Sequence, residues 1–391
     1  MSAPQVSQWS RRFVAAGALW FVAFAAAALL GLGRRPEVVL ALYGFVLHTV
    51  FGKSYALVPS YFDRSLSVPR APAVQFPLST VGVGALAVGT LTGVPNGVST
   101  VGTVSWFLGV LVWIGALGWT VRDNLTGAET GTGEHQAERR PIDRAANAAV
   151  PLVALSVLAG SYELLAAAVG LPTLLGGATP RISHLLGAGG ATLLVVAVGC
   201  RLFPRFLVAH PPRALVAVAV PACAIGPTLL AAGLYDGTLL AVAAGIEGTG
   251  IVGFALLYAV LYARSDRDRV GLTIALLGVL AGVAVVALAA HLVFAGRSTA
   301  VIRLHYRIAL AGFLGLVIVG AAVQFYPPTV GTWPGSSDRT ALAVVGLIAG
   351  GLVAQIAGLA VAPATAVGEV AVLAGTGGYA YLLGSAFVAR S

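Results

Sequence analysis

Residues 303–327 read RLHYRIALAGFLGLVIVGAAVQFYP, a histidine-led, glycine-rich apolar segment that ends at a proline. Its apolar part is long enough to cross the hydrocarbon core of a bilayer as a helix, and similar segments recur along the 391-residue chain. Only 9% of the residues are charged, whereas a soluble domain ordinarily has about 25%. This composition excludes a water-soluble globular protein. It predicts an all-α polytopic membrane protein, in which each helix satisfies its own backbone polar groups.

About twelve apolar segments are long enough to span a membrane. We expect them near residues 13–32, 37–61, 78–95, 101–121, 146–171, 182–203, 213–234, 238–262, 270–295, 300–326, 340–361 and 366–388. The lipid bilayer is therefore the partner that the net charge of +9 indicates, rather than a nucleic acid.

The loop arginines predict the orientation in the membrane. With the N-terminus inside, only Arg34, Arg35, Arg181 and Arg297 fall in outer segments, while the other loop arginines lie inside. Because cytoplasmic loops are enriched in Lys and Arg, we expect a multi-pass protein of the plasma membrane with both termini in the cytoplasm.

The chain divides into three blocks of four helices within a single integral membrane domain. The polar stretch 123–145 predicts a cytoplasmic loop, and a second charged stretch covers residues 264–269. These two stretches divide the chain into a first block at 1–122, a second at 146–269 and a third at 270–391. The second helix of each block carries a histidine followed by a proline, namely His48 with Pro59, His184 with Pro204, and His305 with Pro327. This pattern predicts a threefold pseudo-repeat.

Four of the six histidines are expected in the outer half of the bilayer: His48, His184, His291 and His305. An ionisable residue inside a membrane is costly, so each is a candidate functional residue. Each alone is equally consistent with a neutral histidine hydrogen-bonded to a neighbouring helix. As a set they favour ligation of a metal or a haem. A bis-histidine iron site would need two histidines at matching depth on facing helices, and His48 with His305 is the candidate pair.

The residues around His48 allow two interpretations. Gly44 and Gly52 lie four residues on either side of it, so all three share one helix face. Such a face leaves flat space beside an imidazole, as a porphyrin edge would require. It is also typical of the small-residue grooves that membrane helices use for packing.

At motif level, segment 303–327 resembles the tenth helix of heme-copper oxidase subunit I, and His48 resembles the second low-spin haem ligand of that family. The resemblance extends to the architecture of twelve helices in three blocks. It implies a low-spin haem b near the outer face, bound by His48 and His305. Arg303 and Arg307 flank His305 and are suited to neutralise the haem propionates.

The departures from the family are also informative. Arg303 replaces the histidine that binds the high-spin haem, Ala191 stands at a copper-ligand position, and Val195 stands at the cross-linking tyrosine position. Copper is therefore not expected. Without it, the family's usual reduction of oxygen or nitric oxide is not expected either. Whether this oxidoreductase-like scaffold is an enzyme stays open. The chain also resembles the NnrS-like membrane haem proteins, which are linked to nitric oxide stress.

Two functions follow from these features. The first is a haem b protein with an electron-transfer or gas-related respiratory role, which would receive electrons from a partner subunit or a small copper or haem carrier. The alternative is a proton-coupled secondary transporter. Its relay would use the histidines together with Lys53, Glu163, Glu247 and Glu369.

Overall fold

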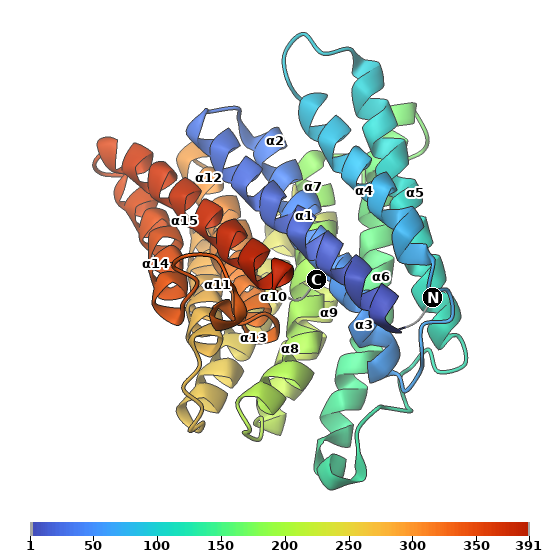
Figure 1. The fold of residues 1–391 in the computed structure, drawn as a ribbon. Helices are drawn as coiled ribbons and strands as arrows, with labels where there is room; N and C mark the ends of the chain where they lie inside the picture. Colours follow the sequence, from blue (N-terminus) through green and yellow to red (C-terminus); the bar gives the residue numbers. More distant parts are fainter. Residues whose placement is uncertain (1–2, 390–391) are drawn as a thin grey trace.

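The computed structural model describes residues 3–389, which form a bundle of helices without any strand in that range (Figure 1). Twelve of its helical spans are long and apolar enough to cross a membrane, as the sequence predicts. Nine spans are single α-helices: α1 (Ala3–Leu29), α4 (Ala71–Val88), α5 (Asn96–Val121), α6 (Arg140–Val169), α9 (Arg213–Gly233), α10 (Gly237–Ala263), α11 (Val270–Phe294), α14 (Asp338–Ala357) and α15 (Pro363–Val388).

The other three spans are composite, and each has a π-helical segment between two α-helices. They are α2 (Arg34–Val38), η1 (Val39–Leu47) and α3 (His48–Tyr61); α7 (Thr179–His184), η3 (Leu185–Thr192) and α8 (Leu193–Phe206); and α12 (Thr299–Arg307), η4 (Ile308–Gly315) and α13 (Leu316–Phe325). We call them the three central helices. Within the most apolar stretch of each, 94%, 72% and 72% of the residues are buried, against 33–50% in the other spans.

The central helices share a register that can be counted back from their prolines. Each π-helical segment ends twelve residues before the proline, at Leu47 before Pro59, Thr192 before Pro204 and Gly315 before Pro327. The segment η1 contacts both η3 and η4, so the three π-helical segments meet in the middle of the bundle. π-Helical turns are rare and concentrate at functional sites, which directs attention to these helices.

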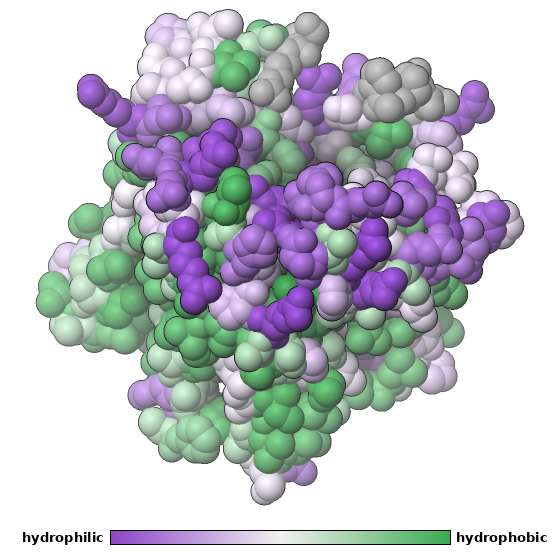
Figure 2. Space-filling view, turned by 90° about the horizontal axis from the view of Figure 1, so that it is seen from below, coloured by the Kyte–Doolittle hydropathy of each residue, from purple (hydrophilic) through white to green (hydrophobic). Residues whose placement is uncertain are grey.

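The polar loops lie at the ends of the bundle. The loops after α5, α8 and α10 form the lower end in Figure 1, and Figure 2 shows hydrophilic residues gathered on that face. Part of the expected loop 123–145 is helical, because η2 (Glu134–Arg139) and the start of α6 at Arg140 fall within it. The buried side chain of Asp143 explains the early start, since it pairs with arginines of α8.

Glycines allow α1 to approach the first central helix closely. A Cβ atom at Gly44 would lie 2.7 Å from the Trp20 side chain, and one at Gly52 would lie 2.5 Å from Cβ of Phe13. Both distances are shorter than real contacts, so only glycine fits at these two positions.

We predict that Gly52→Ala destabilises the protein by about 1–3 kcal/mol, because the added methyl overpacks a contact that includes the backbone oxygen of Ser10 at 3.0 Å. Gly115→Ala on α5 is the control, since a Cβ there meets nothing within 4 Å. Thermal unfolding in detergent should show a lower midpoint for the first variant and an equal or higher one for the second. Equal midpoints for Gly52→Ala and the wild type would contradict this packing.

Candidate functional site

The proline register shows which histidines lie at the same depth. His48 lies eleven residues before Pro59, whereas His184 lies twenty before Pro204 and His305 twenty-two before Pro327. At 1.5 Å per residue, His48 is deeper than the other two by roughly 15 Å along its helix. His305 therefore matches His184 in depth rather than His48.

His184 and His305 lie close enough for their rings to interact electrostatically, and both also interact with Arg34. Nδ1 of His184 is 2.7 Å from the carbonyl oxygen of Pro180, which favours the tautomer with a proton on Nδ1 and an unprotonated Nε2. The His305 ring lies near the backbone of Val285 on α11. Its Nδ1 is buried and has no hydrogen-bond partner among residues 3–389. His184 thus has one anchored ring nitrogen, and His305 has a buried ring nitrogen that no residue of this range binds.

His48 is held by different neighbours. Its Nδ1 lies 2.9 Å from the carbonyl oxygen of Tyr43, its Nε2 lies 3.4 Å from Oγ1 of Thr80 on α4, and the Phe13 ring is 5.9 Å away. Trp20 and Phe13 of α1 fill the space beside Gly44 and Gly52. Of the two interpretations of this glycine face, the packing groove is therefore the one that the structure supports, and no flat space for a porphyrin edge remains there.

The remaining predicted residues separate into exposed and buried ones. Arg303 and His291 are exposed at the upper end of the bundle. Arg307, by contrast, is buried in an ionic cluster. Its guanidinium binds Glu37 through Nε at 2.8 Å and Nη2 at 3.0 Å, and it donates to Glu369 at 2.6 Å and to Gln355 at 3.0 Å. Arg307 is thus occupied by protein partners rather than directed towards a propionate.

Glu37 is a site residue that the sequence analysis missed. Its carboxylate is 98% buried and also accepts a hydrogen bond from Tyr306 at 2.9 Å. It lies twenty-two residues before Pro59, the position that His305 occupies before Pro327. Counting from the prolines is the signal that would have singled it out.

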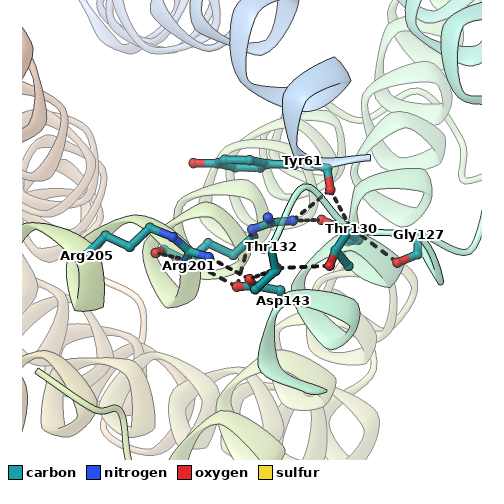
Figure 3. A network of polar contacts seen from close by, with 8 residues as sticks. Tyr61, Gly127, Thr130, Thr132, Asp143, Arg201 and Arg205 are labelled. Carbon is teal, nitrogen blue, oxygen red and sulfur yellow. Dashed lines mark hydrogen bonds and ion pairs between the residues drawn. The ribbon is translucent and has the colours of Figure 1, made fainter. Parts of the chain in front are cut away.

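A second ionic network ties two of the central helices together at the lower end (Figure 3). Asp143 of α6 binds Nη2 of Arg205 at 2.6 Å and lies 3.4 Å from Nε of Arg201, both on α8. Arg201 also donates to the carbonyl oxygen of Tyr61 at 3.0 Å and lies over the Tyr61 ring. Thr132 donates a short hydrogen bond to Asp143. This network joins the end of α3, the loop before α6, and α8.

Between these levels lies a cavity of about 100 Å³, lined by residues of α3, α8 and α13. The three central helices line it with residues at the same distance before their prolines. Ten residues before the proline these are Thr49, Leu194 and Val317; six before it, Lys53, Val198 and Ala321; and two before it, Leu57, Leu202 and Phe325. Because equivalent residues line one cavity, the three prolines lie at a common depth. Lys53 is the one charged residue of the lining, and it donates to the Tyr326 hydroxyl at 2.9 Å beside the Phe325 ring.

The carboxyl of Glu163 has a structural partner. It accepts hydrogen bonds from three backbone N–H groups in the loop before α7, those of Leu174, Leu175 at 2.9 Å and Gly177 at 2.8 Å. A carboxylate held by three backbone donors stabilises the conformation of this loop.

A scan against models of known families finds no match to this chain, and neither does a search of curated proteins. The function is therefore inferred from the geometry of residues 3–389. In that part of the chain, no three His, Cys, Asp or Glu side chains converge to hold a metal ion.

We predict that Asp143→Asn destabilises the protein by about 3–5 kcal/mol, because it leaves Arg201 and Arg205 without their buried counter-charge. The control is Asp123→Asn, whose carboxylate is 61% exposed and pairs with Arg64 at 3.2 Å. At neutral pH, the midpoint of thermal unfolding should fall strongly in Asp143→Asn and change little in Asp123→Asn.

The control pair has its own pH dependence. Arg64 holds the pKa of Asp123 below its usual range. The stability that the Arg64–Asp123 pair contributes is therefore present at neutral pH and is lost as the pH falls through that lowered pKa. If the two Asp→Asn variants lowered the thermal midpoint equally at neutral pH, that would contradict a structural role for the network of Figure 3.

Proposed function

We propose that this protein is a membrane haem b protein built on the architecture of heme-copper oxidase subunit I, with an electron-transfer or nitric oxide or oxygen-related role. The observation that carries the proposal is the pair formed by His184 and His305, which lie at one depth on two central helices. The shared proline register of these helices further supports the proposal that the three four-helix blocks are pseudo-repeats.

The residues at this pair suit an iron porphyrin better than a bare metal ion. Two histidines alone leave most coordination positions of a metal unfilled, whereas a porphyrin supplies four nitrogens and needs only axial ligands. The orphaned Nδ1 of His305 and the backbone anchor of the His184 ring are features of ligands held ready by their surroundings. We therefore propose His184 and His305 as the ligand pair, in place of the pair with His48 that the family resemblance implies.

The chain's own residues would orient and neutralise such a group. Pro180 fixes the His184 tautomer, and Arg34 interacts with both histidines from the start of α2. Arg34 and the exposed Arg303 are suited to bind propionates, since Arg307 is engaged by Glu37 and Glu369. When bound, the iron would supply one-electron chemistry or gas binding.

A copper centre is not part of the proposal. Ala191, at the family's copper-ligand position, is fully buried and apolar, and Val195 lines the apolar cavity. An electron-transfer or sensing role is therefore favoured over reduction of oxygen or nitric oxide at a binuclear site.

A proton-coupled secondary transporter is the second candidate, and one arrangement favours it. Ionic networks centred on Arg307 and on Asp143 lie at opposite ends of the central helices, with the 100 Å³ cavity between them. Salt bridges that open in turn on either side of such a cavity would suit alternating access.

An optical spectrum of the purified protein, oxidised and reduced, tests the haem. We expect low-spin b-type bands that are lost in His184→Ala and in His305→Ala, because each variant removes an axial ligand. His48→Ala should keep the bands and lower the thermal midpoint, since His48 packs against Phe13 and Thr80. His291→Ala, on an exposed residue, is the control and should change neither.

Other outcomes are equally informative. A colourless wild-type protein with no bound iron would overturn the haem proposal and leave the transporter. Bands that vanish in His48→Ala but survive in His184→Ala would restore the ligand pair of the family. Stoichiometric copper on metal analysis would show that the position of Ala191 has been misaligned with the family.

A further inference from the structure

Glu247 is a buried carboxyl that neither the haem pair nor the two ionic networks use. It lies ten residues into α10, far from either end of that helix, and is 96% buried. Both of its oxygens are buried and have no hydrogen-bond partner among residues 3–389. A Cβ atom at Gly226 would lie 2.6 Å from Oε2 of Glu247, so the carboxyl lies directly against the backbone of α9.

The groups that face Glu247 carry no positive charge. From α9 the titratable neighbour is the Cys223 thiol, and behind it Cys200 of α8 interacts with Cys223. On the other side α11 packs against α10, where Val286 approaches Gly248. The sole titratable residue of α11 is His291, which is exposed at its upper end. The arginines of α8 at this side, Arg201 and Arg205, are bound to Asp143.

An ionised carboxylate in this position would lack both a counter-ion and a donor. Burying an unpaired charge in an apolar medium is so costly that such a group neutralises instead. A metal cation does not solve the problem, because Ca²⁺ or Mg²⁺ needs six or more oxygen ligands and the neighbours here are carbon and sulfur atoms. A proton is the ligand that fits.

We propose that Glu247 is a proton-binding site, occupied as long as α9 and α10 remain packed together. Release of the proton requires the contact at Gly226 to open to water, which couples the proton to the position of α9. The proposal does not depend on bound haem.

Glu163 provides a matched control within the same chain. It is also a fully buried glutamate in a membrane span, but its carboxylate accepts three backbone hydrogen bonds. Donors of this kind stabilise the ionised form. The two glutamates should therefore differ in protonation although they are similarly buried.

Infrared spectroscopy of the full-length protein at neutral pH tests the proposal without any reagent. We expect a carbonyl stretch of a protonated carboxylic acid that disappears in Glu247→Gln and persists in Glu163→Gln. Because glutamine matches a neutral acid in shape, Glu247→Gln should keep the wild-type thermal midpoint, whereas Glu163→Gln should lower it. A protonated-acid band unchanged in a folded Glu247→Gln variant would overturn the proposal, and so would a large loss of stability in that variant alone.

Labelling with dicyclohexylcarbodiimide adds a chemical readout. This apolar reagent adds as a whole to a protonated carboxyl and rearranges to an N-acylurea, with no leaving group. Mass spectrometry should locate the adduct on Glu247 in the wild type, with none on Glu163 and none at this position in Glu247→Gln. An adduct on Glu163 at the level found on Glu247 would contradict the difference in protonation.

Discussion

A charge inside a bilayer needs an opposite charge or several hydrogen-bond donors, and this requirement determines where the ionisable side chains of this protein lie. Arg307 has Glu37 and Glu369, Asp143 has Arg201 and Arg205, and Glu163 has three backbone N–H groups. The Arg307 and Asp143 sets join helices that are far apart in sequence, whereas Glu163 binds the loop that follows its own helix. The few charges of the chain therefore act as ties between helices that otherwise pack through small apolar side chains.

These ties lie above and below the π-helical segments of the central helices. The Arg307 cluster joins α2 and α12 to α14 and α15, while the Asp143 network joins α3 and α8 to α6. The first central helix is therefore held at both ends, and its π-helical segment η1 contacts η3 and η4 in the middle of the bundle. The cavity below them is the space left by apolar side chains at equivalent positions.

Composition and apolar segment length predicted the twelve membrane helices, because each helix in a bilayer needs its own run of apolar residues. The sequence also identified the three central helices through their histidines and prolines. It could not identify the partners of Arg307, since Glu37 is 270 residues away, at the start of the expected span 37–61. It paired His48 with His305 because both were placed in the outer half of the bilayer, whereas counting residues to the proline puts His48 deeper. The Gly44 and Gly52 face was open to two interpretations, which only the position of α1 could separate.

The proline register also explains why one level of the bundle carries most of the chemistry. Twenty-two residues before the proline, the three central helices have Glu37, Ile182 and His305; twenty residues before it, they have Val39, His184 and Arg307. All the ionisable side chains at these six places thus lie at one depth, near the upper end. At the equivalent places that line the cavity, the residues are apolar apart from Lys53, Thr49 and Ser54. A shared cavity lining below a differentiated upper level fits the proposed pseudo-repeat, in which the blocks keep one packing scheme while a single layer acquires distinct roles. Within that layer the glutamate and arginine neutralise each other, which leaves the two histidines as the residues free to bind a ligand.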